Sequence, residues 1–109
     1  MADNNKYSDL KINNDDLELD NAGNPVFIFD RDVIAQDIRH AIRESGVLYQ
    51  LIGESRPQHQ ALVFNRLQIE IEKDLRVLPG TSEVQIIGAG NLLLTAQTEL
   101  GQIELGVNL

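Results

Sequence analysis

Residues 55–77, SRPQHQALVFNRLQIEIEKDLRV, carry the helical pattern around which the rest of the chain is organised. Ser55 and Gln58 have the spacing of a capping box, and Pro57 falls in the first turn, where a helix loses no internal hydrogen bond. Apolar side chains recur at steps of three and four residues and so share one stripe: Phe64, Leu67, Ile71 and Leu75. We therefore expect a helix that begins near Arg56 and buries this stripe against a core.

The opposite side of this helix carries a second set of apolar residues, Leu62 and Ile69. They share that side with the basic residues Arg66, Lys73 and Arg76. One interpretation is that the two apolar side chains are isolated at the surface or covered by a loop, as single apolar residues often are. The other is a partner-binding surface with an apolar centre and a basic rim.

The helix is expected to end in a charged tripeptide, Asp74-Leu75-Arg76. Leu75 belongs to the buried stripe. Residues two apart on a helix do not face each other, so Asp74 and Arg76 should flank Leu75 on opposite sides without pairing. Each is then free to meet a different neighbour, in this chain or in another one.

The N-terminal part of the chain is polar at first and then predicts short strands. Residues 1–9 offer little to bury and are expected to be flexible, whereas residues 10–109 are expected to form one domain. Leu10 and Ile12 alternate with polar residues before a turn, and Leu17 and Leu19 do so after it, which predicts a β-hairpin. A turn cluster at residues 21–25 then leads into an apolar strand at residues 26–29.

A first helix is predicted over residues 32–45. Asp30 or Asp32 is placed to cap its start, and Gly46 to end it in a left-handed conformation. Its buried stripe consists of Ile34, Ile38, Ala41 and Ile42. An extended or irregular apolar link over residues 47–52 should join it to the second helix.

Three further strands are expected after the turn at Pro79-Gly80, around residues 84–86, 92–94 and 103–107. Their short connections favour an antiparallel meander. The fold class is therefore α+β, with two helices packed on a small antiparallel C-terminal sheet and with an N-terminal β-hairpin.

Composition excludes several functions. The chain has 17 acidic and 9 basic residues and a net charge of -8, which disfavours nucleic-acid binding. It has no cysteine, so disulfides and thiolate chemistry are excluded. The first ten residues lack a basic start and an apolar run, and no segment is apolar enough to span a bilayer, so we expect a cytoplasmic protein that does not contact membranes.

Metal and cofactor sites are not indicated. Asp16, Glu18 and Asp20 alternate like the first ligands of a calcium loop, but Asn21 stands where that loop needs glycine and Phe27 where it needs a carboxylate. His40 and His59 lie on different predicted helices, and no cysteine or second ligand accompanies either of them. We expect neither a metal nor a cofactor.

Catalytic patterns are equally weak. Ser55 and His59 are one turn apart, but no third residue orients the imidazole. Glycoside cleavage needs two carboxyl groups in different environments, and nothing distinguishes such a pair among the candidates Glu54, Glu70, Glu72 and Asp74. We do not expect an enzyme.

A family resemblance adds to this interpretation. The strand VFIF, the helix DVIAQDIRHAI, the turn GESRP, a helix ending in KDLRV and a terminal meander occur in an order that resembles the small baseplate wedge proteins of contractile phage tails. Related proteins occur in type VI secretion. The family's Glu-Pro-Arg tripeptide matches 74–76, where aspartate replaces Glu and leucine replaces Pro. Gly53-Glu54 and Pro57 match its Gly-Glu turn and following Pro, whereas 58–60 lack its glycine.

The resemblance implies a structural protein of the virion. A wedge subunit lies between the baseplate core and the tail tube and sheath in six copies, seeds the sheath, and is assembled in the host cytoplasm; the isolated protein can be a monomer. The edge formed by residues 102–107 offers a route for strand addition. The expected partner-binding residues are Glu54, Leu62, Arg66, Ile69, Lys73, Asp74, Leu75 and Arg76. Alternatives are a head-tail connector or tail completion subunit, and a muralytic, lysozyme-like enzyme.

Overall fold

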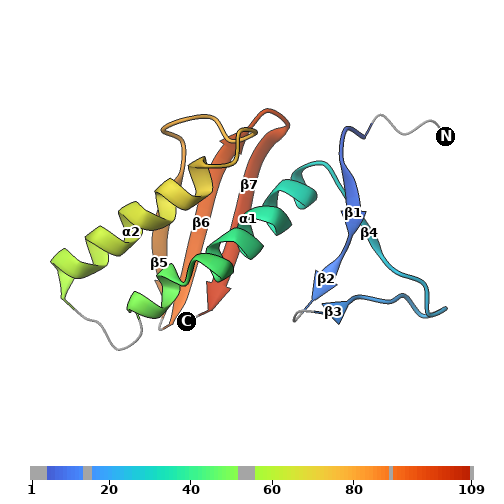
Figure 1. Cartoon of the computed structure of the whole chain (residues 1–109), viewed down its shortest axis with the longest axis horizontal. Helices are drawn as coiled ribbons and strands as arrows, with labels where there is room; N and C mark the ends of the chain where they lie inside the picture. The colour runs from blue at the N-terminus through green and yellow to red at the C-terminus, as the bar shows by residue number, and fades with distance from the viewer. Residues whose placement is uncertain (1–4, 14–15, 52–55, 89, 109) are drawn as a thin grey trace.

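Two helices cover one face of a three-stranded antiparallel sheet, and a small β-ribbon lies beside them (Figure 1). The computed structural model describes residues 5–13, 16–51, 56–88 and 90–108. The helices are α1 (Arg31–Ser45) and α2 (Pro57–Glu72), joined through a 3-10 helix, η1 (Val47–Leu51). The link expected to be extended or irregular is thus partly helical.

The C-terminal sheet has the order β5-β6-β7 and confirms the predicted meander. Its strands are β5 (Glu83–Gly88), β6 (Asn91–Thr98) and β7 (Gly101–Asn108). Alternate side chains of β6 and β7 point towards the helices and are buried: Leu92, Leu94, Ala96, Ile103 and Leu105. These residues form one core with the buried faces of α1 and α2. The α+β class is confirmed.

Helix α1 agrees closely with the predicted span. Gly46 ends it in the left-handed conformation, with φ 72°. Its buried residues are Val33, Ile34, Ile38 and Ile42. Ala41, assigned to this stripe from the sequence, is exposed. The buried Val33 lies at the start of the helix, where α1 also contacts the ribbon.

Helix α2 is shorter than the sequence predicted. Pro57 occupies its first turn as expected, but Ser55, the proposed cap, lies outside the described residues. Val63, Leu67 and Ile71 are its buried residues, and Phe64 is partly buried against them. The helix ends at Glu72, so the tripeptide 74–76 lies in the turn that follows.

The N-terminal ribbon, as we name residues 8–29, contains β1 (Ser8–Leu10), β2 (Ile12–Asn13), β3 (Asp16–Leu17) and β4 (Phe27–Phe29). The predicted hairpin is present, since Ile12 pairs with Leu17. The first strand begins at Ser8, inside the segment expected to be flexible. It pairs with β4, so that Leu10 lies opposite Phe27.

The ribbon makes the molecule elongated. Figure 1 shows it at one end, next to α1. The molecule measures 51 × 30 × 22 Å, and its Cα radius of gyration is 15.2 Å. A compact chain of this length should have a radius of about 13 Å. No helix in the described part of the chain has the length and apolar character needed to cross a membrane.

Candidate functional site

In the turn after α2, the side chains of Asp74 and Arg76 bind each other. Asp74 Oδ1 accepts hydrogen bonds from the backbone N–H of Arg76 at 2.9 Å and from its Nε at 2.8 Å, and Asp74 Oδ2 accepts one from Nη2. The expectation that Asp74 and Arg76 cannot pair was therefore wrong. It assumed a helical backbone, whereas α2 has ended at Glu72 and the turn brings the two side chains to the same side.

Arg76 also connects this turn to the rest of the domain. Its Nη2 donates to Asp37 Oδ2 on α1 at 2.9 Å, and its guanidinium lies 5.1 Å from the centre of the Tyr7 ring. The hydrogen bonds that Arg76 donates to Asp74, and then to Asp37, raise the pKa of Arg76, although burial opposes the shift. The guanidinium lowers the pKa of Asp74 in return. Arg76 therefore does not belong to the exposed rim of α2 to which the sequence assigned it.

The N-terminal segment closes over this pair. Asp30 Oδ1 accepts hydrogen bonds from the backbone N–H groups of Lys6 and Tyr7 at 2.7 and 3.0 Å. Asp30 was expected to cap α1, but its side chain forms no hydrogen bond to the start of that helix. The Tyr7 hydroxyl donates to Glu99 at 2.6 Å, and Lys6 pairs with the same carboxylate at 3.1 Å. The hydroxyl and then the lysine lower the pKa of Glu99. We call the following residues the clasp: Tyr7, Asp30, Asp37, Asp74, Arg76 and Glu99.

Leu75 lies at the tip of the turn that the clasp holds. Its side chain is 98% exposed, so its assignment to the buried stripe was wrong. Val77 takes the core position instead: it is buried and forms a β-bridge with Thr98. The chain leaves the helix to bring Val77 into the core, and this change of direction turns Leu75 outward.

The outer face of α2 is exposed, which agrees both with isolated surface residues and with a partner-binding surface. Leu62 is 49% and Ile69 is 60% exposed. Arg66 donates to the Gln50 side chain at 2.5 Å, and Lys73 pairs with Glu70 at 2.7 Å. A shallow groove of about 540 Å³ is lined by Asn65, Gln68, Ile69, Glu72 and Lys73. Glu54, the remaining expected partner-binding residue, lies outside the described residues.

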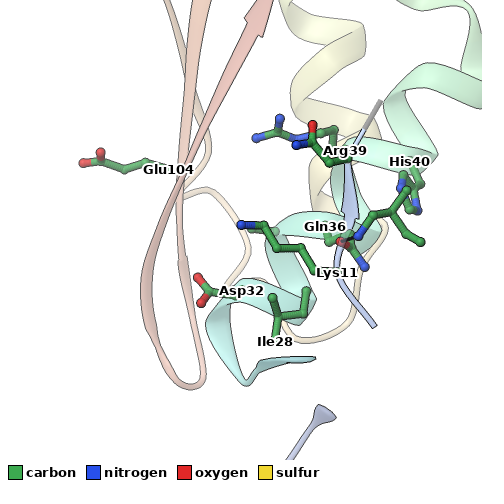
Figure 2. Close-up of a pocket in the computed structure, with 10 residues that line it drawn as sticks. Lys11, Ile28, Asp32, Gln36, Arg39, His40 and Glu104 are labelled. Atoms are coloured by element: carbon green, nitrogen blue, oxygen red, sulfur yellow. Dashed lines mark hydrogen bonds between the residues drawn. The ribbon is translucent and has the colours of Figure 1, made fainter. Parts of the chain in front are cut away.

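A second cavity, of about 490 Å³, lies between the ribbon, α1 and β7 (Figure 2). Lys11, Gln36, Arg39 and His40 line it, and Glu104 projects away from them. His59 lies apart, with its Nε2 3.0 Å from the Gln50 carbonyl oxygen. No group of three or more potential metal ligands occurs within the described ranges.

Asp74 and Arg76 were identified from the sequence and Asp30 was given another role as a helix cap, whereas Tyr7, Asp37 and Glu99 were missed. Asp37, Tyr7 and Glu99 are distant in sequence from Arg76, and no spacing rule links them to it. The one available signal was that Arg76 closely follows the acidic residues Glu70, Glu72 and Asp74 in the sequence.

The fold and the clasp define a small α+β protein that exposes a leucine on a fixed turn. The chain belongs to a family described as "Protein of unknown function (DUF2590)", whose model matches residues 8–106. It is 37% identical over 106 residues to an uncharacterized 12.7 kDa protein in the lys 3′ region of Haemophilus phage HP1, strain HP1c1. The match covers 94% of this chain and 96% of the phage protein. The family is thus associated with phages. No solved structure matches the chain.

Proposed function

We propose that this protein is a structural subunit of a contractile phage tail, a baseplate wedge protein that links the baseplate core to the tail tube and sheath. The observation that carries the proposal is Leu75, which is almost fully exposed on a turn held by the clasp. The proposed setting is the tail baseplate, in six copies, after assembly in the host cytoplasm.

A fixed, exposed leucine suits a binding anchor. Protein interfaces depend on a few side chains that enter pockets of the partner. The bonds of Asp74 and Arg76 already order the backbone on both sides of Leu75, so binding loses little conformational entropy there. In this proposal Asp74 and Arg76 position the turn, and Leu75 makes the contact.

Two further features support an adaptor role. Leu62 and Ile69 extend the exposed apolar surface along α2. The meander ends in an edge strand, β7, which is a route for strand addition by a sheath subunit. The uncharacterized relative is encoded by phage HP1, which agrees with a phage origin of this chain.

The two alternatives are a connector-type subunit and an enzyme. A head-tail connector or tail completion subunit would also link other virion proteins, but at a different location in the virion. A muralytic enzyme needs a carboxylic acid with a raised pKa. The described carboxyl groups with displaced pKa values, Glu72, Asp74 and Glu99, are all displaced downward. A peptidoglycan turbidity assay would reveal lysis if this alternative were correct.

The proposal is tested by complementing a phage that lacks this protein with wild type, Leu75→Ser, or Asp74→Ala combined with Arg76→Ala. Purified tails are probed for the protein, and particles are scored for sheath by electron microscopy. We expect wild type in tails. Leu75→Ser should fold normally, because exposed substitutions change stability by less than about 0.5 kcal/mol, yet give few sheathed tails.

Tyr49→Ser is the matched control, since Tyr49 is also exposed but lies on η1, away from the clasp. It should complement like wild type. A wild-type protein absent from mature particles would contradict the tail-subunit proposal. Normal sheathed tails with Leu75→Ser would instead show that the tail role does not depend on this anchor, and Leu62→Ser combined with Ile69→Ser would then test the outer face of α2.

A further inference from the structure

Arg39 on α1 differs from the other basic residues of the chain in having no partner. The chain has 9 lysine and arginine residues and 17 acidic ones, so each cation has many possible partners. The other basic residues each form a hydrogen bond, an ion pair or another electrostatic interaction: Lys6, Lys11, Arg31, Arg43, Arg56, Arg66, Lys73 and Arg76. Arg39 forms none with any residue of the described ranges.

Arg39 lines the cavity between the ribbon, α1 and β7, which we call the ribbon cavity (Figure 2). Its volume of about 490 Å³ lies within the range of roughly 300–1,000 Å³ that is usual for ligand sites. Part of its wall is apolar, and part is polar: the apolar residues are Ile12, Ile28 and Ala35, and Asn13, Gln36 and His40 are polar. An apolar wall with a few polar groups is typical of a site that binds a small group.

The charges in the ribbon cavity leave one cation free. Lys11 and Arg39 extend to the same side in Figure 2, whereas Glu104 points away from both. The Lys11 ammonium is already paired with Glu18 at 3.1 Å. Asp32 precedes Arg39 by two helical turns, about 10 Å along the axis, and forms no ion pair with any described residue. The cavity can therefore neutralise one negative charge, at Arg39, and a second one would meet Asp32.

We propose that the ribbon cavity binds a single carboxylate group, carried by a small organic acid or by a peptide, and that Arg39 is its main contact. The planar guanidinium presents two parallel N–H groups, which match the two oxygens of a carboxylate. The apolar wall suits the short hydrocarbon stem next to that carboxylate. Repulsion by Asp32 selects against dianions. This site shares no residue with the turn that carries Leu75, so it is independent of the proposed tail role.

The test is an NMR titration of the isotope-labelled full chain with propionate and, at equal ionic strength, with sulfate. We expect propionate to shift the backbone amide signals of Ile12, Arg39 and His40 in a saturable manner. The amide signals of β5, which does not line the cavity, serve as the internal control and should not move. Sulfate, a dianion, should bind about twofold to fivefold more weakly, because its second charge meets Asp32.

Substitutions of Arg39 test its role as the contact. Arg39→Gln should weaken propionate binding at least about tenfold, since a charged pair of hydrogen bonds is lost. Arg39 is exposed, so the fold should be unaffected. Arg39→Lys keeps the charge without the two parallel donors and should give intermediate binding. Arg31→Gln is the matched control, because it removes the same charge from the same helix outside the cavity, and it should bind like wild type.

Asp32→Asn tests the selectivity. Asp32 is exposed and forms no hydrogen bond or ion pair with its described surroundings, so the change removes its charge alone. Sulfate should then bind about as tightly as propionate. A preference for propionate that is unchanged in Asp32→Asn would contradict the selective role of Asp32.

Two short peptides with blocked ends, one with a central glutamate and the other with glutamine, distinguish the sources of the carboxylate. Tighter binding of the glutamate peptide than of propionate would identify a protein segment as the ligand, and equal binding would identify the free acid. Three results would overturn the proposal. They are the absence of saturable shifts with both propionate and the glutamate peptide, equal binding by wild type and Arg39→Gln, and equal binding of the two peptides.

Discussion

At the scale of single residues, Arg76 links the parts of the molecule that meet at one end of the domain. It bonds to Asp74 within its own turn and to Asp37 on α1, and it stacks on Tyr7 from the N-terminal segment. Its guanidinium can do this because it is planar and presents several donors in fixed directions. Arg76 therefore positions the turn that exposes Leu75.

Asp74→Asn tests this electrostatic role. Arg76 lowers the pKa of Asp74 in the folded protein, so the ionised carboxylate stabilises the fold at pH values above the ordinary aspartate pKa of about 3.9. This contribution is lost as the pH falls through the lowered folded pKa. At pH 7 the variant should be less stable by about 1–2 kcal/mol, and the difference should shrink as acid protonates wild-type Asp74.

Urea unfolding along a pH series measures this difference. Glu104→Gln is the control, because Glu104 is exposed and lies outside the clasp. A difference between Asp74→Asn and wild type that stays constant down to strongly acidic pH would contradict an electrostatic contribution from Asp74.

At the scale of elements, Gly46 shows where local sequence determines structure. It ends α1 with φ 72°, a conformation in which a Cβ atom is strained. Gly46→Ala should therefore destabilise the protein by about 1–2 kcal/mol. Gly106 on β7 gives a matched comparison, since its φ is not positive and a Cβ there would meet nothing within 4 Å. Gly106→Ala should be neutral or stabilising by up to about 1 kcal/mol. Thermal unfolding of both variants measures the contrast, and equal losses would contradict it.

The elements with regular local signals were predicted well from sequence. The apolar periods of the two helices and of the meander, together with Pro57 and Gly46, placed both helices and all three C-terminal strands. The end of α2 was not predictable in this way, because the stripe continues to Leu75 without a break. The helix ends because tertiary packing buries Val77 beside Thr98, which a continued helix would not do.

Tertiary packing, which local sequence does not show, also explains why Leu75 and Arg76 were misassigned. Apolar residues at both 75 and 77 could have supplied the core, and only the position of β6 determines which one does. The clasp is likewise a product of tertiary structure, since the partners of Arg76 at Tyr7 and Asp37 are far away in sequence. Exposure of Leu62 and Ile69, in contrast, followed from their position opposite the buried stripe, and it is common to isolated surface residues and to a partner-binding surface.

At the scale of the whole molecule, the ribbon and the helical domain are joined by a few polar contacts. One contact is made by Gln36 on α1. Its side-chain amide accepts a hydrogen bond from the N–H of Ile12 and donates one to the carbonyl of Leu10, as a neighbouring strand would. The other contact is made by Asp30, which holds the backbone of Lys6 and Tyr7 next to the clasp. The ribbon can therefore open locally while the core of helices and sheet stays folded.

Gln36→Ala should separate the two parts. It removes two hydrogen bonds, each with a net contribution of about 0.5–1.5 kcal/mol, from an element with little buried surface of its own. Amide hydrogen exchange should accelerate for residues in β1 to β4 by about tenfold, while α1, α2 and the C-terminal sheet keep their protection. Gln97→Ala is the matched control, since its side chain bonds to Gln102 at the surface, and it should leave the ribbon unchanged. If Gln36→Ala accelerated exchange equally throughout the molecule, ribbon and core would be one cooperative unit, which would contradict local opening of the ribbon.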